Sequence, residues 1–195
     1  MPTYQREVRV AAPLDDVWAF HSRVEGLESL TPDWMGLRVE GVRRPDGDGE
    51  REDAGDERGA GEDEVLTAGT ELRLSVRPLG VGPRQRWTSR ITRRERGDAD
   101  SGSDATGGSS RAVRRDGAAV FEDEMVDGPF PEWHHRHQFY AVSDDETLVR
   151  DRVTYELPIV GRLPAVGGLL GPLGWLGFEP MFRERHRRTK RILEG

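Results

Sequence analysis

Apolar and polar residues alternate with a period of two in three consecutive segments near the end of the chain. These segments are 121–126, 132–140 and 147–157. Because successive side chains of a strand point to opposite faces, this period predicts three strands that share one apolar face. Buried polar groups need partners or water, so polar residues on that face indicate the wall of a cavity rather than a dry core. The polar residues on the apolar face are Asp123, His135, His137 and Asp151.

The same period predicts four more strands ahead of these three. Pro13 and the two acids that follow it favour the start of a helix. Apolar residues at helical spacing then predict a short helix over 14–24, a second over 25–30 and a long last helix over 173–193. The four additional strands are expected at 3–11, 37–44, 71–78 and 85–94.

A chain of 195 residues suits a single domain over 1–195 with a buried core. Two polar segments between strands, at about 46–63 and 97–110, are predicted to be disordered insertions, since they cannot bury enough apolar surface to offset the entropy of ordering. The first holds nine acids and two arginines, a local charge of −7 that equals the net charge of the whole chain. The excess of acidic residues is therefore concentrated in one predicted loop. The acidic composition fits a protein from a salt-rich cytosol and a protein from a GC-rich genome equally well.

The three strands and the turn between the first two carry a recognisable pattern of residues: Phe121-x-Asp123, Gly128-Pro129-Phe130, Trp133-x-His135-x-His137-x-Phe139 and Asp151-x-Val153-x-Tyr155-x-Leu157-Pro158. The pattern resembles the SRPBCC proteins, the START and polyketide-cyclase-like superfamily, and within it a bacterial and archaeal branch. The resemblance covers nearly the whole chain apart from the two insertions. It implies an α+β helix-grip fold, in which a curved antiparallel sheet of about seven strands surrounds a long C-terminal helix, with two short helices after the first strand.

The resemblance also implies a cavity between the sheet and the last helix. Such a cavity would bind a small hydrophobic ligand (a lipid, an isoprenoid, a quinone or a polyketide-like molecule) for transfer, sequestration or sensing. Ligand pockets are mostly apolar with a few placed polar groups, and the inner faces supply both kinds of residue. The expected ligand-binding residues are Trp34, Trp87, Asp123, Trp133, His135, His137, Phe139, Asp151, Tyr155, Phe178, Met181, Phe182 and Arg185.

Three interpretations of the inner polar residues remain open. The favoured one is an ion-pair network in which Arg185 on the last helix pairs with Asp123 or Asp151. In the second, His135 and His137 are the catalytic acid/base pair of a cyclase or dehydratase, a lyase or isomerase, because histidine titrates near neutral pH. The third and least favoured is a metal bound by Asp123, His135 and His137, which the nearby arginine would oppose. We therefore predict no metal and no cofactor.

Composition narrows the remaining function classes. The absence of cysteine excludes disulfides and thiolate metal sites. The N-terminal residues lead straight into a strand without a signal segment, which predicts a cytoplasmic protein. The sequence leaves the oligomeric state open between a monomer and a weak dimer. Acids interrupt the basic cluster at 183–191 in a chain that is acidic overall, so nucleic-acid binding is not expected. The apolar segment 159–178 is too broken by proline and glycine to span a membrane; it either packs ahead of the last helix or contacts a lipid surface transiently.

Overall fold

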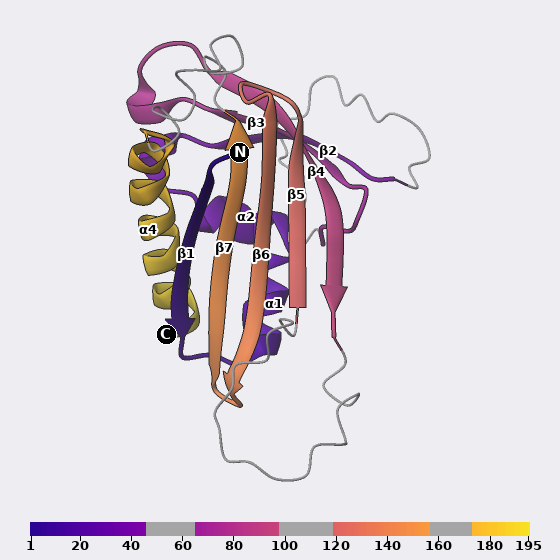
Figure 1. Ribbon diagram of the computed structural model, residues 1–195, viewed down its shortest axis with the longest axis vertical. Coiled ribbons are helices and arrows are strands. Elements are labelled where there is room, and N and C mark those ends of the chain that lie inside the picture. The colour runs from indigo at the N-terminus through magenta and orange to yellow at the C-terminus, as the bar shows by residue number, and fades with distance from the viewer. Residues whose placement is uncertain (46–64, 98–118, 157–172) are drawn as a thin grey trace.

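The computed structural model describes residues 1–45, 65–97, 119–156 and 173–195. Within these ranges the chain forms seven strands, three α-helices and two 3-10 turns (Figure 1). In chain order they are β1 (Thr3–Val10), α1 (Leu14–His21), α2 (Val24–Leu30), η1 (Asp33–Met35), β2 (Arg38–Arg43), β3 (Glu71–Val76), η2 (Pro78–Gly80), β4 (Gln85–Arg96), β5 (Ala119–Asp127), β6 (Glu132–Ser143), β7 (Glu146–Glu156) and α4 (Leu173–Leu193).

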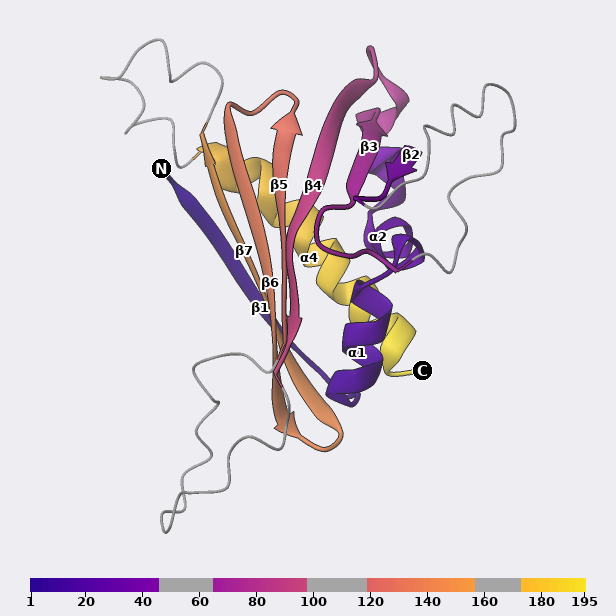
Figure 2. The same ribbon diagram turned by 90° about the vertical axis from the view of Figure 1, so that its right-hand side faces the viewer.

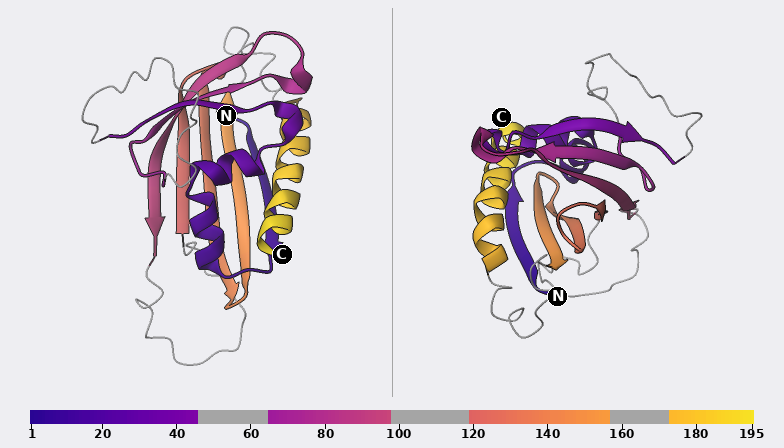
Figure 3. Two further views of the ribbon diagram at one scale, coloured as in Figure 1. Left: turned by 180° about the vertical axis from the view of Figure 1, so that it is seen from behind. Right: turned by 90° about the horizontal axis from the view of Figure 1, so that it is seen from above.

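All seven strands belong to one antiparallel sheet with the order β1-β7-β6-β5-β4-β3-β2. The helices lie together on one side of this curved sheet (Figure 2). Seen from behind, α1, α2 and α4 are all in front of the strands (Figure 3). Helix α4 contacts the edge strand β1 and also α2, so it closes the open side of the sheet. The predicted helix-grip fold is confirmed.

Some element boundaries differ from the predicted ones. Helix α1 ends at His21, and α2 begins separately at Val24. Strand β3 ends at Val76 because Pro78 starts η2 instead of continuing the ladder. The segment 46–63, nearly all of 97–110 and most of 159–178 lie outside the described residues, so the two insertions and the lipid contact stay predictions. No helix in the described ranges is long and apolar enough to cross a membrane.

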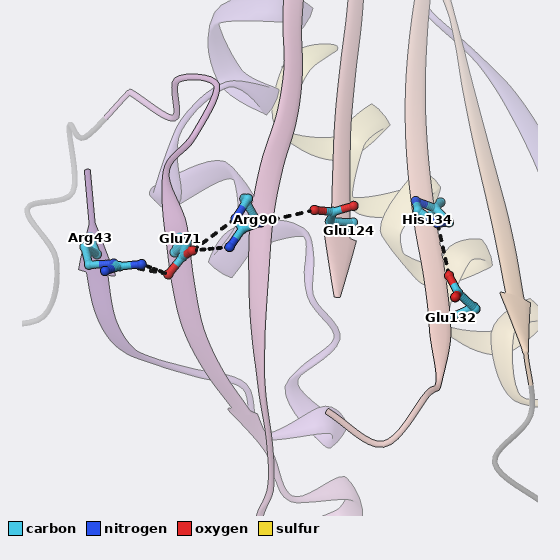
Figure 4. A network of polar contacts seen from close by, with 6 residues as sticks. All are labelled: Arg43, Glu71, Arg90, Glu124, Glu132 and His134. Carbon is cyan, nitrogen blue, oxygen red and sulfur yellow. Dashed lines mark hydrogen bonds and ion pairs between the residues drawn. The ribbon is translucent and has the colours of Figure 1, made fainter. Parts of the chain in front are cut away.

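The outer face of the sheet carries exposed ion pairs that cross several strands (Figure 4). Glu71 on β3 bonds Arg43 on β2 at 2.6 Å and Arg90 on β4 at 2.8 Å. Arg90 also lies 3.6 Å from Glu124 on β5. Exposed pairs of this kind contribute about 0–1 kcal/mol each, so this face is solvated, as the alternation predicts, and the inner face carries the stability.

The register of the central strands brings the inner polar residues together. Phe121 pairs with His137, which pairs in turn with Asp151 on β7. One pleat further along, Asp123 pairs with His135. Because directly opposite residues of an antiparallel pair have Cβ atoms about 5 Å apart, the register alone places two carboxylates and two imidazoles within contact distance.

Candidate ligand-binding cavity

A cavity of about 270 Å³ lies between the inner face of the sheet and the helices. Its wall is formed by α1, α2, strands β3 to β6 and α4, together with the connections next to them. Ligand pockets usually measure about 300–1,000 Å³, so this one suits a small molecule. Aliphatic side chains from two strands and a helix make one part of the wall: Leu27, Leu30, Leu72, Leu74, Val76 and Ile91. The polar side chains that reach it include His21, Ser89, Asp123, His135, His137 and Arg185.

Asp123 is held at the cavity by two neighbours from adjacent strands. The Ser89 hydroxyl donates a hydrogen bond of 2.9 Å to its Oδ2. His135 Nδ1 lies 3.4 Å from its Oδ1. Burial raises the pKa of the Asp123 carboxyl, but the hydrogen bond and charge of His135 outweigh this and leave the pKa below its ordinary value. Asp123 therefore stays ionised at neutral pH.

Asp151 lies deeper, with 2% of its surface exposed, and three imidazoles surround it. His186 Nε2 on α4 forms a hydrogen bond of 2.5 Å with its Oδ2. His137 Nδ1 contacts Oδ1, and His135 Nε2 lies 3.5 Å from the same oxygen, both as ion-pair contacts without hydrogen-bond alignment. Burial raises the pKa of Asp151, yet its contacts with the three imidazoles hold it well below its usual range. A fixed buried negative charge results.

The pKa values of the neighbouring histidines shift in opposite directions around this carboxylate. Burial lowers the pKa of His135, but its position between Asp123 and Asp151 more than compensates and raises it. Burial and the charge of His135 lower the pKa of His137 to about 4. Burial and His137 lower the pKa of His21 to about 3. The cavity wall thus presents an imidazole with a raised pKa beside one with a lowered pKa, and their ring centroids lie 4.0 Å apart.

The predicted ion pair between Arg185 and Asp123 or Asp151 is not present among the described residues. In the part of the chain that the structure describes, no carboxylate lies within ion-pair distance of its guanidinium, which reaches the cavity with Cζ 6.0 Å from the Phe182 ring centroid. The partner of Asp151 is instead His186, one residue further along α4. One residue turns a helix by 100°, so the buried stripe runs through Phe182, His186 and Thr189 rather than through Arg185.

Comparison with known proteins identifies the family. A family model described as "Polyketide cyclase / dehydrase and lipid transport" matches residues 10–181. The chain belongs to this family. No curated protein matches the sequence. Among solved structures, the di-domain ARO/CYC BexL from the BE-7585A biosynthetic pathway is 16% identical with a TM-score of 0.53, and the match covers 100% of this chain. It covers 47% of BexL, so the chain spans about half of that protein's length.

Two further solved structures resemble the chain over nearly its whole length. A protein from Arthrobacter aurescens is 13% identical, with a TM-score of 0.55 and coverage of 98% of this chain and 86% of that one. A START superfamily protein from Mycobacterium smegmatis is 12% identical, with a TM-score of 0.51 and coverage of 98% and 99%. At these identities the likeness establishes the fold, so the chemistry of this polyketide cyclase / dehydrase family member rests on its own residues.

Four of the thirteen residues expected at the ligand lie outside the described wall of the cavity. Trp34 is 38% exposed and lines a separate surface hollow with several arginines. Phe139 is fully buried against Trp18, because the far end of the long strand β6 passes under α1. Tyr155 and Asp151 are buried on β7 and do not line the cavity. The other nine line the cavity: Trp87, Asp123, Trp133, His135, His137, Phe178, Met181, Phe182 and Arg185.

Three polar residues of the site were missed by sequence reasoning. Ser89 lies between Trp87 and Ile91 in β4, and the strict alternation of this strand places all three on the inner face. The alternation could therefore have predicted Ser89 as a cavity residue. His21 appears in the sequence only as one position of an apolar helical stripe. His186 follows Phe182 by four residues, which is the spacing of one helix face. The sequence analysis nevertheless assigned the preceding residue, Arg185, as the partner of the inner aspartates.

A metal remains an alternative use of the same residues. Asp123, His135 and His137 offer one ligand atom each, all within 4.8 Å of one another. A carboxylate with two imidazoles could coordinate a divalent cation. The positive charge of Arg185 nearby, which contributes to the lowered pKa of His137, opposes such an ion. Asp123 is also already in contact with His135, and the neighbouring Asp151 is in contact with His137. The metal therefore stays the least favoured interpretation.

Proposed function

We propose that the protein binds a small, largely apolar molecule in this cavity, for transfer, sequestration or sensing. Lipid, isoprenoid, quinone and polyketide-like molecules are the candidate ligand classes. The observation that carries the proposal is the wall itself, which is mainly aliphatic and aromatic and has its polar groups gathered around Asp123 and His135. An apolar hollow with a few convergent polar groups is the usual form of a ligand site, and the family's description includes lipid transport.

Filling the cavity is expected to weaken binding strongly without unfolding the protein. Leu27 on α2 lines the cavity and is only partly buried, so the added volume of Leu27→Trp can enter the hollow. Titration with N-phenylnaphthylamine, a neutral probe that fluoresces in apolar surroundings, measures the affinity. The variant should bind at least about tenfold more weakly, a loss of about 1.4 kcal/mol.

The matched control for this experiment is Val126→Trp. Val126 lies on β5, is 40% exposed and does not line the cavity. This variant adds the same side chain outside the hollow and should keep the affinity of the unmodified protein. Equal affinity of all three proteins would mean that the probe binds elsewhere and would count against the proposal.

A second candidate function is a cyclase or dehydratase that uses the same cavity. The observation in its favour is the adjacent pair of histidines with opposite pKa shifts, His135 as the acid and His137 as the base. Environments that shift the pKa values of two neighbouring groups in opposite directions are typical of acid/base sites. Incubation with a synthetic aromatic β-hydroxy ketone, followed by mass spectrometry for loss of water, distinguishes the two functions. Dehydration that His137→Gln removes while probe affinity survives would favour catalysis; no dehydration above background is the result that binding alone predicts.

A further inference from the structure

Arg185 is the one arginine among the described cavity-lining residues, and it donates no hydrogen bond to any described residue. Its neighbour on the same helix differs in this respect. Arg188 donates to the Thr31 carbonyl at 3.0 Å and lies 3.0 Å from Asp33. The guanidinium carries five N–H donors in a fixed plane and cannot lose its charge by ordinary titration. Donors that face a largely apolar cavity without a protein acceptor need one from another molecule.

The two carboxylates whose charges act on Arg185 lie beyond ion-pair distance of its guanidinium. Asp123 is engaged by Ser89 and His135, and Asp151 by His186 and His137. Their charges reach the guanidinium only through space: burial lowers the pKa of Arg185, and Asp151 and Asp123 act in the opposite direction. Both aspartates are therefore tied to the sheet and to His186, which leaves the fork of Arg185 open toward the cavity.

We propose that Arg185 binds the carboxylate of the ligand, so that the natural ligand is a small amphipathic organic acid. This inference rests on the proposed function, because it names the chemical class of the molecule in the same cavity. A carboxylate matches the planar fork with two parallel hydrogen bonds, which a neutral carbonyl cannot do. The apolar body of the acid lies against the aliphatic wall of β3 and β4, at Leu72, Leu74 and Ile91.

The position of Arg185 fits this orientation of the ligand. Its Cζ lies 6.0 Å from the Phe182 ring centroid, and the same ring lies 5.3 Å from the ring of His135, which places Arg185 on the histidine side of the cavity. His135 reaches the cavity on the same side, where its ring nitrogens face Asp123 and Asp151. Among the described residues, the cavity thus has a polar region, in which Asp123 is engaged by its neighbours and Arg185 is not, and an apolar region, the two parts that an amphipathic acid requires.

The test compares naphthoic acid with naphthamide, two probes of nearly equal size that differ in charge at neutral pH. Isothermal titration of the unmodified protein should show the acid binding about 10- to 100-fold more tightly, the range for hydrogen bonds to a charged group. Arg185→Gln should make the two affinities equal by weakening the acid alone. Arg185→Lys keeps the charge without the planar fork and should retain part of the preference.

The matched control is Arg183→Gln, which removes an exposed arginine from the same helix and should leave the preference unchanged. Equal binding of acid and amide to the unmodified protein would overturn the ligand class and leave the proposed function standing. A preference for the acid that survives in Arg185→Gln would overturn the role of Arg185. Binding of neither probe, with N-phenylnaphthylamine also unbound, would instead contradict the proposed function.

Discussion

Replacing Asp151 with alanine is expected to destabilise the protein by about 3–5 kcal/mol. The carboxylate is 2% exposed and contacts His135, His137 and His186. Its removal leaves His135 beside one carboxylate instead of two and leaves His186 Nε2 without its acceptor. Urea unfolding followed by tryptophan fluorescence measures the loss. For a chain of this size the melting temperature should fall by about 10 °C.

The control for this substitution is Asp145→Ala, an exposed aspartate in the turn between β6 and β7, which should change the stability by less than about 0.5 kcal/mol. A double-mutant cycle then identifies the partner of Asp151. The coupling with His186→Ala should be about 0.5–3 kcal/mol and should exceed the coupling with Arg185→Ala. A larger coupling to Arg185 would restore the ion pair that the sequence predicted and contradict the His186 contact.

Stability is expected to fall by several kcal/mol as the pH drops from about 6.5 to about 4. His137 and His21 are neutral in the folded protein, with pKa values lowered to about 4 and about 3 from 6.5. In this window the unfolded chain takes up protons that the folded chain does not, so the unfolded state gains stability as the pH falls. Each unit of pKa difference corresponds to about 1.4 kcal/mol, which gives about 3 kcal/mol for His137 alone.

His135 acts in the opposite direction above this window. Because its pKa is raised in the folded state, its contribution is fully present below pH 6.5 and is lost as the pH rises through the folded value. The two effects together predict greatest stability near pH 6.5. His21→Leu should flatten the acid side of the profile, while the exposed His134→Gln should not. Denaturant unfolding at a series of pH values tests this, and an unchanged acid slope in His21→Leu would refute it.

The sheet and its two faces were predictable from the sequence because alternation is a local property. The assignment of Asp123, His135, His137 and Asp151 to the inner face needs only the period of two and is confirmed by their positions. The element types were predictable for the same reason. Boundaries that depend on a neighbouring segment were not, such as the end of β3 at Val76 where η2 begins.

The partners inside the site could not be read from the sequence, because they depend on how elements are rotated and aligned. Arg185 and His186 differ by 100° around α4, and only the docking of the helix decides which one meets Asp151. A register shift next to Ser89 in β4 likewise sets which residue it meets on β5. Phe139 shows a third limit, since one face of a long curved strand serves both the cavity and the core. Whether the cavity residues bind a ligand stays a prediction.

Native mass spectrometry of the protein purified from its own host tests the central claim most directly. The unmodified protein should carry a non-covalently bound small organic molecule, released on collision. Leu27→Trp, expressed and purified in the same way, should carry none because the indole fills the cavity. Identical masses after correction for the substitution, with no molecule released from either protein, would contradict ligand binding in this cavity.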